Sequence, residues 1–410
     1  MAQSLKLNFG EAKVPAHPQW FEGEVLQQAL VPADSGRELE VLAVWFVNHG
    51  RTRPHIHSVD QLLVVVEGLC IVATQTERKV IGVGEQALIP KGEWHWHGAA
   101  TGETLCHLSI KRPGPTDWDQ PLLNFMSKLG VTFPQTEIGS DPIVVRDFAQ
   151  AVEGMGYQFL LTYDHVLGAN PDRPGGWSGP YTYKHSFHEI FVLYGYLAGL
   201  TQRIELVTGI LILPQRQTVL VAKQAAEIDV LSRGRLRLGI GIGWNAVEYE
   251  ALGMNFHDRG RRAEEQVALL RRLWTEELVT FEGRWHRVTD AGLNPPPVQR
   301  PIPILMGGYA EPVLKRVARL ADGWIALGNP VNNKPQIERL RQYTREAGRS
   351  VDSVRIIGGL SLRQTTPDGW RPTLAAWEDA GAHEVTVNTM GAGFKTPDEH
   401  IEAIRRVKNL

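Results

Sequence analysis

Four side chains in the N-terminal part of the chain have the types and spacing of a metal-binding set. His55 and His57 are two residues apart, so on an extended strand both imidazoles project from the same face. Gln61 follows four residues later, and His95 comes from a separate segment, GEQALIPKGEWHWHGA. Three imidazoles and one oxygen suit a divalent transition metal such as Mn, Fe, Co, Ni or Zn. The pattern predicts one such ion held by His55, His57, Gln61 and His95.

The glycines around these residues fit a small β-barrel. Gly68 and Gly92 permit tight turns with positive φ, which bring the ligand-bearing strands together. The spacing H-x-H-x3-Q-x6-G, followed by G-x5-P-x-G-x2-H, resembles the two motifs of the cupin family over residues 50–98. Most cupins carry glutamate where this chain has Gln61, so a bound ion lacks one negative charge and its identity stays open.

The HWHGA run and the glutamine resemble the small cupins that include bacterial hydroxynitrile lyases. In those proteins a further histidine in a late strand borders the metal, and His107 matches its position. The resemblance therefore implies that His107 transfers a proton. We expect His97 to be an outer neighbour of the ligands or a surface residue, because the motif assigns only His95. The alternative is a metal-free cupin whose histidines are satisfied interior groups.

A second set of residues follows in RLRLGIGIGWNAVEYEALG. Gly239, Gly241 and Gly243 alternate with isoleucines, so a strand sends them to one face, where a flat ring or its phosphate could approach the backbone. Gly307 and Gly308 end another apolar run before a helix, whose N-terminus could meet an anion. The alternative is that these glycines only make tight βα turns. A Rossmann interpretation is poor, because the G-x-G-x-x-G spacing is incomplete.

Asp164 and His165 close the apolar segment FLLTYDH. An imidazole at the C-terminal end of a barrel strand can give or take a proton at neutral pH. The alternative is a loop-capping aspartate beside a surface histidine. His188 and Glu189 form a second pair at a helix start, where helix capping is the expected role.

The elements that must position these residues fall into two groups. Between Leu39 and Ile110, short β-branched runs broken by glycine turns predict a compact antiparallel sandwich or barrel. The motif resemblance implies that this is the all-β barrel of a cupin. Beyond the proline-rich and charged segment KRPGPTDWDQP, apolar strands alternate with amphipathic helices. Eight such units predict a closed (β/α)8 TIM barrel, with a doubly wound open sheet as the alternative. The boundary is expected near Pro121, giving domains 1–121 and 122–410. The expected barrel strands are LGVTF, FLLTYDH, RIELVTGILIL, RLRLGIGIG, IPILMGG, GWIAL, VRIIGGLSL and EVTVNTM.

The second domain resembles the luciferase-like (bacterial luciferase family) oxidoreductases, closely over residues 129–323. The segments TYDHV, TGILILPQRQTVLVAKQAAEIDVLS and SRGRLRLGIGIGWN carry the resemblance, especially to the branch that uses the deazaflavin coenzyme F420. It implies F420, or FMN as the alternative, at the barrel mouth. It also implies catalysis by His165 and Asp164 and a non-proline cis peptide at Gly209–Ile210 in a bulged third strand. The implied cofactor contacts are Asp164, Thr208, Gly209, Gly241, Gly243, Trp244, Asn245, Gly307 and Gly308.

Composition excludes several classes of partner. The chain has 410 residues, enough for two hydrophobic cores, and its formal net charge of -2 gives no general attraction to nucleic acid or anionic membranes. The start lacks a signal-peptide pattern, and no apolar run is long enough to span a bilayer. Cys70 and Cys106 lie in apolar strand-like segments, which indicates buried reduced thiols. We therefore expect a cytoplasmic protein.

Together these features predict an F420- or FMN-dependent oxidoreductase or monooxygenase acting on a small organic substrate. The metal-binding cupin is expected to be an accessory or second catalytic domain. A homodimer is expected, with a flavin or deazaflavin reductase as a further possible partner. Two alternatives stay open. One is a metal-dependent cupin lyase, isomerase or dioxygenase served by the barrel, and the other is a small-ligand binding protein with a degenerate barrel.

Overall fold

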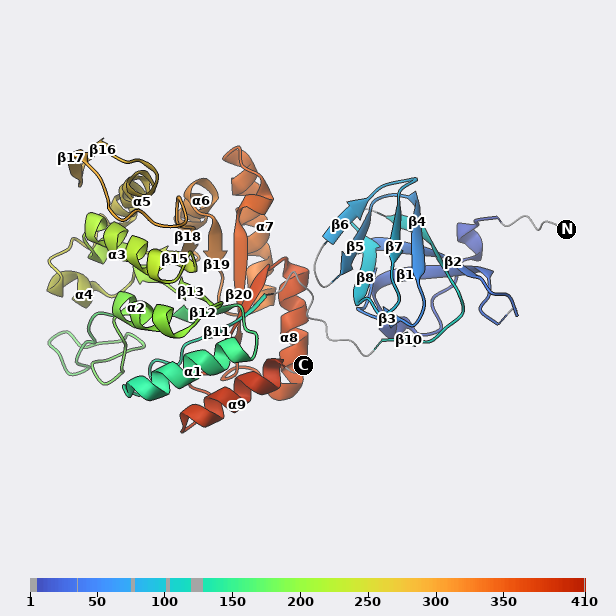
Figure 1. Ribbon diagram of the computed structural model, residues 1–410, viewed down its shortest axis with the longest axis horizontal. Coiled ribbons are helices and arrows are strands. Elements are labelled where there is room, and N and C mark those ends of the chain that lie inside the picture. The colour runs from blue at the N-terminus through green and yellow to red at the C-terminus, as the bar shows by residue number, and fades with distance from the viewer. Residues whose placement is uncertain (1–5, 35, 75–77, 101–103, 119–127, 409) are drawn as a thin grey trace. The chain divides into compact units, whose positions relative to one another are not determined.

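The computed structural model describes residues 6–34, 36–74, 78–100, 104–118, 128–408 and 410. The chain divides into two compact units, Met1–Phe125 and Met126–Leu410. The boundary predicted at Pro121 lies outside the described residues. Figure 1 shows a first unit built almost entirely of strands and a second unit in which helices surround strands. Each unit is described by itself below.

The first unit is the antiparallel cupin that the sequence predicts. Its main sheet has the order β6-β5-β8-β2-β9-β4-β7, with β1 paired to β2, and a small ribbon joins β10 to β3. The short 3-10 helices η1 (Phe9–Glu11) and η2 (Pro18–Trp20) precede it. The strands are β1 (Phe21–Val31), β2 (Glu40–Thr52), β3 (Ile56–His57), β4 (Gln61–Glu67), β5 (Cys70–Thr74), β6 (Arg78–Ile81), β7 (Gln86–Ile89), β8 (His95–Ala99), β9 (Leu105–Lys111) and β10 (Thr116–Asp117).

Strand alternation places the cupin's ligand candidates and its apolar core on the same inner face. In β4 the buried positions are Gln61, Leu63 and Val65, while the residues between them are more exposed. Burial of side chains such as Leu63 and Val65 stabilises the fold by roughly 1.5–3 kcal/mol each. The sequence analysis began the sheet at Leu39 and did not predict β1. This strand pairs with β2 along its whole length, but its Glu and Gln residues give it no apolar strand pattern.

The second unit is a closed eight-stranded parallel barrel, so the open-sheet alternative is wrong. The pairings run β13-β12-β11-β21-β20-β19-β18-β15, and β13 also pairs with β15, which closes the ring. The barrel strands are β11 (Lys128–Thr132), β12 (Phe159–Thr162), β13 (Glu205–Thr208), β15 (Leu236–Gly241), β18 (Ile304–Gly307), β19 (Gly323–Ile325), β20 (Arg355–Ser361) and β21 (Glu384–Asn388).

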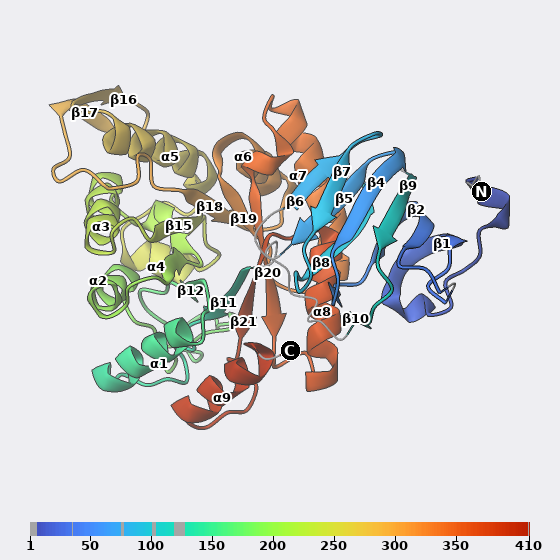
Figure 2. The same ribbon diagram turned by 45° about the vertical axis from the view of Figure 1, so that its right-hand side comes forward.

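Helices cover the outside of this barrel, as the two views in Figures 1 and 2 show. The long helices bury one apolar side against the strands; for example α1 buries Val145, Phe148 and Val152. The helices are α1 (Pro142–Gly154), α2 (Ile190–Leu200), α3 (Thr218–Leu231), α4 (Ala246–Ala251), α5 (Arg259–Thr275), α6 (Glu311–Leu320), α7 (Pro330–Glu346), α8 (Pro367–Ala380) and α9 (Pro397–Lys408). The short elements are β14 (Leu211–Ile212), η3 (Leu213–Gln215), β16 (Val279–Glu282), β17 (Arg287–Ala291) and η4 (Val351–Ser353).

The third barrel strand is interrupted between β13 and β14. The peptide bond Gly209–Ile210 is cis, as the family resemblance implies. A Cβ on Gly241 would lie 1.8 Å from Cδ1 of Ile210, and a Cβ on Gly239 would lie 2.0 Å from the carbonyl oxygen of Thr208. The absence of side chains on these two glycines therefore lets the interrupted third strand pack close to β15. The space beside their Cα atoms is filled by residues of that strand and is not left open for a cofactor ring.

We expect Gly239→Ala to destabilise the barrel by about 1–3 kcal/mol, because the new Cβ meets a backbone oxygen that cannot turn away. Gly241→Ala should cost less, because its contact is the end of the Ile210 side chain, which can change rotamer. Urea unfolding followed by tryptophan fluorescence measures both changes.

The matched control is Gly199→Ala near the end of α2, where a Cβ meets nothing within 4 Å. Alanine favours helix over glycine, so this variant should unfold no earlier than the parent. If Gly239→Ala unfolded at the same urea concentration as Gly199→Ala, the close approach of the two strands would not be a constraint.

Candidate functional site

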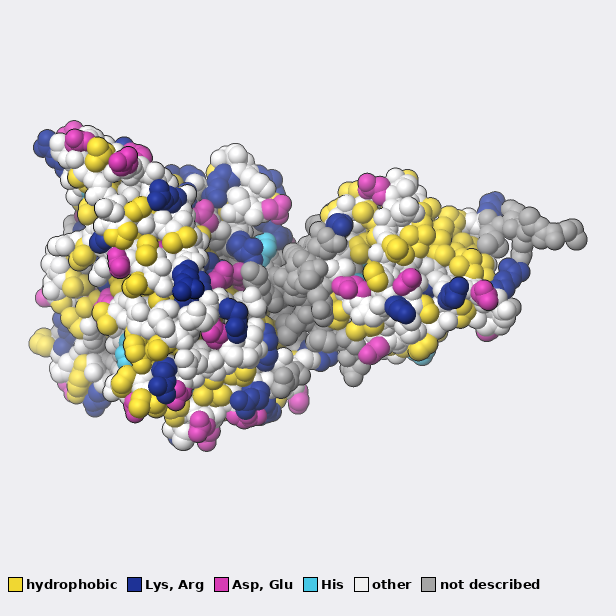
Figure 3. Space-filling model, viewed as in Figure 1, with side chains coloured by type: hydrophobic (Ala, Val, Ile, Leu, Met, Phe, Trp, Pro, Cys, Tyr) yellow, Lys and Arg dark blue, Asp and Glu magenta, His cyan; other side chains and the backbone are white. Residues whose placement is uncertain are grey.

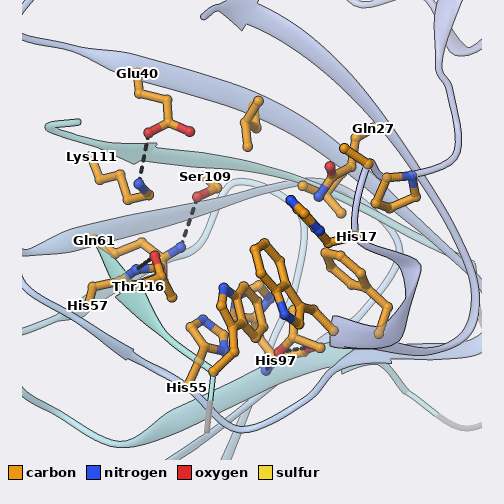
Figure 4. A pocket seen from close by; sticks show the side chains of 18 residues that line it. His17, Gln27, Glu40, His55, His57, Gln61, His97, Ser109, Lys111 and Thr116 are labelled. Atoms are coloured by element: carbon orange, nitrogen blue, oxygen red, sulfur yellow. Dashed lines mark hydrogen bonds and ion pairs between the residues drawn. The ribbon is translucent and has the colours of Figure 1, made fainter. Parts of the chain in front are cut away.

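The predicted metal ligands of the cupin come together in its interior. His55 and His57 flank the start of β3, Gln61 begins β4 and His95 begins β8. None of the four is more than 4% exposed. The ring centroids of His55 and His95 are 4.2 Å apart, and that of His57 lies 4.8 Å from His55 and 5.3 Å from His95. Figure 4 shows His55, His57 and Gln61 facing one cavity.

Hydrogen bonds on the far side fix the orientation of each imidazole. His55 and His95 each donate through Nδ1 to the backbone carbonyl two residues earlier, at 2.8 and 3.0 Å. Nδ1 of His57 lies 2.8 Å from the Thr116 hydroxyl. Because these bonds hold the Nδ1 atoms, the Nε2 atoms face inward. Such outer hydrogen bonds are the usual support of metal-ligating histidines.

Gln61 is oriented in the same way. Its amide nitrogen donates to Oγ of Ser109 at 2.8 Å, which turns its Oε1 atom toward Nε2 of His95 at 3.0 Å. A neutral imidazole has one N–H, and that of His95 is already given to a carbonyl, so two acceptors face each other across this distance. Nε2 of His57 is buried without a partner. A cation among these atoms satisfies all of them.

Burial keeps these imidazoles neutral, which is the form that binds metal. It lowers the pKa of His57 to about 3 and that of His95 to about 4. Burial, together with the charges of His95 and His57, also places the pKa of His55 well below its ordinary value. All three are therefore uncharged donors at neutral pH.

His97 is not a surface residue, because only 3% of it is exposed. Its ligand atoms lie within 4.8 Å of those of His55 and His95, so these three histidines are also a geometrically possible metal group. Nδ1 of His97 lies 3.1 Å from Nε2 of His107, which leaves the other nitrogen of His97 for the interior. The motif spacing assigns only His95 as a ligand. His97 stands two residues later, so strand alternation places it on the same face of β8, and this alternation is the sequence signal that indicates it.

His107 lies behind His97 rather than at the cavity surface. It is fully buried, and its Nδ1 atom has no partner. Burial lowers its pKa to about 4. Among the described residues that line the cavity, His97 is present and His107 is not. The predicted proton transfer by His107 would therefore pass through His97.

The cavity beside these histidines has a volume of about 200 Å³. Its wall includes an ion pair, in which Nζ of Lys111 lies 2.7 Å from Oε2 of Glu40. Trp118 covers His55, with ring centroids 4.2 Å apart. The cavity, which is partly open to solvent, thus brings donor atoms, one ion pair and an aromatic edge together.

We expect His57→Ala to lose the bound metal ion, because Nε2 of His57 is a ligand in the predicted set. His97→Ala should retain it, since His97 is already hydrogen-bonded to His107. Equilibrium dialysis against Co²⁺ followed by elemental analysis measures the stoichiometry. His17→Ala, at another place on the cavity wall, is the control. Metal loss from His97→Ala with retention by His57→Ala would assign the ion to His55, His95 and His97.

In the barrel, Asp164 follows the end of β12 and is 3% exposed. Its oxygens accept hydrogen bonds from the backbone N–H of Ile212 at 3.0 Å and from Nη2 of Arg216 at 2.8 Å. Burial raises the pKa of Asp164 despite this guanidinium. Both oxygens are used within the protein, so Asp164 anchors the interrupted third strand. Its predicted contact with a cofactor stays a prediction.

His165 is held by a carboxylate that the sequence analysis missed. Nδ1 of His165 lies 3.0 Å from Oε1 of Glu248, whose side chain is 1% exposed. The same oxygen accepts the backbone N–H of Val166 at 3.0 Å. Glu248 stands three residues after Asn245, where it would ordinarily be taken for part of a helix-capping box. Nε2 of His165 remains free to act on a ligand.

Aromatic side chains surround His165 at the C-terminal end of the barrel strands. Its ring centroid lies 4.7 Å from that of Phe187, 5.1 Å from Tyr181 and 5.8 Å from Trp244. A cavity of about 300 Å³ borders His165, Tyr181, Phe187 and Asn245. Tyr181 and Phe187 belong to the long segment between β12 and α2, and the sequence analysis assigns a role to neither. The mouth therefore offers a partly apolar space beside an oriented imidazole.

The other predicted cofactor contacts are spread around the same end of the barrel. Thr208 donates its hydroxyl hydrogen to the carbonyl of Gly239 at 2.6 Å, so it joins two strands. Asn245 caps α4 by accepting from the N–H of Val247, whereas α6, which follows Gly308, has no side-chain cap. Of the two helix starts, α6 is the one without a side-chain cap, and its first turn carries the carboxylate of Glu311. Gly209, Gly243 and Gly307 lie at or beside strand ends, and Trp244 is 47% exposed.

His188 and Glu189 have the capping role expected of them. The carboxylate of Glu189 accepts the backbone N–H of Val192 at 2.8 Å and begins α2, while the N–H of His188 donates to Gln135 at 3.0 Å. Oε1 of Glu189 also binds Nη1 of Arg216, at 2.8 Å. This pair therefore supports the fold around Asp164.

We expect Glu248→Gln to lower the free energy of unfolding by about 1–3 kcal/mol at neutral pH, since a charged hydrogen bond to His165 is lost. Burial alone would raise the pKa of Glu248, but its hydrogen bond and charge interaction with His165 lower it overall from 4.5. A lowered pKa stabilises the folded state above pH 4.5, and this contribution disappears as the pH falls through the folded value. The difference between the two proteins should therefore shrink in acid.

Chemical denaturation at several pH values measures this effect. Glu250→Gln, in the same helix, is the control because the Glu250 side chain is 78% exposed. A difference between parent and Glu248→Gln that stayed constant into acid would show that the carboxylate is not held ionised by His165.

Both units of the chain match known protein families. Residues 130–365, more than half of the chain, match the luciferase-like monooxygenase family, and residues 44–111 match the cupin domain. An uncharacterized protein of Mycobacterium tuberculosis is 33% identical over 272 residues, which cover 65% of this chain and 90% of that protein. The chain belongs to the luciferase-like monooxygenase family. Within it, the cupin is an additional N-terminal domain.

Relatives of this family member use different cofactors. An FMNH2-dependent dimethylsulfone monooxygenase of Pseudomonas fluorescens is 30% identical over 255 residues, covering 61% of this chain and 65% of that enzyme. The coenzyme F420-dependent tetrahydromethanopterin reductase of Methanopyrus kandleri shares the fold, with a TM-score of 0.56 and 16% identity over 69% of this chain and 97% of that structure. No helix in the described part of the chain is both long and apolar enough to cross a membrane.

Proposed function

We propose that the barrel is an oxidoreductase that uses coenzyme F420, or FMN as the alternative, for hydride transfer or oxygen activation on a small organic substrate. The observation that carries this proposal is the pair formed by His165 and Glu248. It lies at the C-terminal end of the barrel strands, where barrel enzymes place their chemistry, and beside a cavity of about 300 Å³. Family membership supports the cofactor class.

The residues at the mouth fit such a cofactor. The interrupted third strand, with Gly209 and Ile210, offers backbone on which a flat ring could rest. The uncapped start of α6 after Gly308 could bind its phosphate. Gly308 has a φ of 122°, which an L side chain rarely adopts, and an added Cβ would lie 3.2 Å from Cγ1 of Val313, so a side chain fits there only with strain. Trp244, whose ring centroid lies 5.8 Å from that of His165, would border the cofactor.

The chain's own residues have distinct tasks in this proposal. When bound, the cofactor supplies the hydride, or as reduced flavin the electrons for oxygen activation. His165 gives or takes a proton at Nε2, because Glu248 holds its Nδ1–H and so fixes the tautomer. Tyr181, Phe187 and Trp244 exclude water from the imidazole. Asp164 is a positioning residue that holds the third strand through Ile212.

The cupin is proposed to bind a divalent transition metal through His55, His57, Gln61 and His95, as an accessory or second catalytic domain. The acceptor-to-acceptor contact between Gln61 and His95 favours a resident cation. The same contact supports the second candidate function, a metal-dependent lyase or dioxygenase in the cupin. A binding protein with a degenerate barrel has no comparable support, because His165 and Glu248 form an oriented pair.

We also propose that the protein is cytoplasmic and forms a homodimer, with a flavin or deazaflavin reductase as a further partner. The outward side of α2 supports the dimer, because Val192 is 74% and Tyr196 is 41% exposed in a helix without any charged residue. Figure 3 shows positive and negative side chains interspersed over the visible face of the barrel unit. This mixture gives nucleic acid no field of one sign to bind.

We expect the purified chain to quench the fluorescence of added F420 or FMN in a saturable titration, and Gly308→Ala to weaken that binding by about tenfold or more. The reason is the positive φ of Gly308 and its place before the uncapped helix. Gly348→Ala is the matched control, since Gly348 also has a positive φ of 72° but follows the far end of α7. Absence of saturable binding for both cofactors would contradict the proposed function.

A further inference from the structure

We propose that the cupin cavity binds a small organic anion, a 2-hydroxy or 2-oxo carboxylate, whose oxygens complete the coordination of the metal ion. This inference rests on the proposed metal site in the same domain. It adds the chemical class of the ligand, which neither the sequence motifs nor the relatives supply. The residues of the cavity do not neutralise the positive charge of a bound metal ion.

The proposed ligand set carries no negative charge. His55, His57 and His95 are neutral imidazoles, and the amide of Gln61 is neutral where a glutamate would bring a carboxylate. A divalent ion bound here keeps both of its positive charges in a buried site. Buried charge without compensation is costly, so the site favours an anionic ligand in the open coordination positions.

The protein's nearest carboxylate does not supply this compensation. Among the described residues that line the cavity, Glu40 is the carboxylate and Lys111 the ammonium. Their Oε2 and Nζ atoms are 2.7 Å apart, and their side chains are 12% and 9% exposed, so the pair cancels its own charge. The positive charge of the metal would remain.

Lys111 adds a positive contribution on the metal side of the pair. Lys111 in β9 is the strand partner of Gln61 in β4, and both residues line the cavity together with His55 and His57. An ammonium has three N–H donors, and one of them is given to Glu40. Figure 4 shows Glu40, Lys111, Ser109 and Gln61 along one side of the cavity. The remaining donors can hold an anion that is bound to the metal.

The cavity limits the ligand's size. A cavity of about 150 Å³ accommodates benzene, so the present volume of about 200 Å³ fits a short-chain or single-ring acid. Trp20 stacks on Trp118 with ring centroids 4.9 Å apart and an angle of 7°, and both line the cavity. Four protein ligands leave two positions on a six-coordinate ion, which a carboxylate and its neighbouring hydroxyl or carbonyl oxygen can fill together.

The test uses the full chain loaded with Co²⁺ and two probes of nearly equal shape, lactate and lactamide. The visible spectrum of the bound cobalt reports a ligand that enters its coordination sphere. We expect lactate to change the spectrum saturably and lactamide to bind at least about tenfold more weakly, a difference of about 1.4 kcal/mol. The readout is binding and needs no knowledge of the reaction.

Two variants should change lactate affinity in opposite directions. Gln61→Glu supplies the missing negative charge at the metal and should weaken lactate binding about tenfold, while cobalt is retained. Glu40→Gln frees Lys111 from its partner and should strengthen lactate binding. Glu24→Gln makes the same change of charge at an exposed position of the cupin and should leave the affinity unchanged.

The outcomes separate the two proposals. A parent protein that binds no cobalt by elemental analysis overturns the metal site, and the anion site with it. Full cobalt loading with equal binding of lactate and lactamide, or with no response to either, overturns the anion site alone. An unchanged lactate affinity in Gln61→Glu at full loading also overturns it, because charge at the ligand set would then have no effect.

Discussion

The close approach of the third and fourth barrel strands is the constraint on which the barrel site depends. The strand breaks at Gly209, and Ile210 occupies the space that a side chain on Gly241 would need. Asp164 then fixes the chain beyond the break by accepting the N–H of Ile212. Small residues on one strand therefore allow irregular backbone on its neighbour. That irregular backbone is the surface at the barrel mouth to which the proposed cofactor binds.

The histidine beside this surface depends on the same end of the barrel. His165 follows Asp164 directly, so the anchoring of one residue sets the place of the next. Glu248 reaches His165 from α4, which follows the fourth strand. One carboxylate thus positions backbone and the other orients an imidazole. Asp164 thus has a structural contact within the protein, and its predicted catalytic role stays a prediction.

The proposed metal site of the cupin depends on a different feature, namely uncharged imidazoles buried in the interior of the domain. Burial keeps His57 and His95 uncharged, and outer hydrogen bonds turn their Nε2 atoms inward. The amide of Gln61 faces His95 with an oxygen, an arrangement that is satisfied by a cation. Because no charge in this set would offset a metal ion, the proposed metal site favours an anionic ligand.

The sequence by itself determined both folds and the position of most donor residues. Spacing of two places His55 and His57 on one face of a strand, and eight strand–helix units require a covered parallel sheet. Tertiary structure decided the pairing of residues far apart in the chain. Glu248 with His165 and Glu40 with Lys111 are separated by many residues, and no local periodicity encodes which buried charge meets which. The tertiary structure also shows that the side chain of Ile210 fills the space beside Gly241. A glycine in a sequence indicates that a side chain is absent, but it does not indicate which group occupies the space.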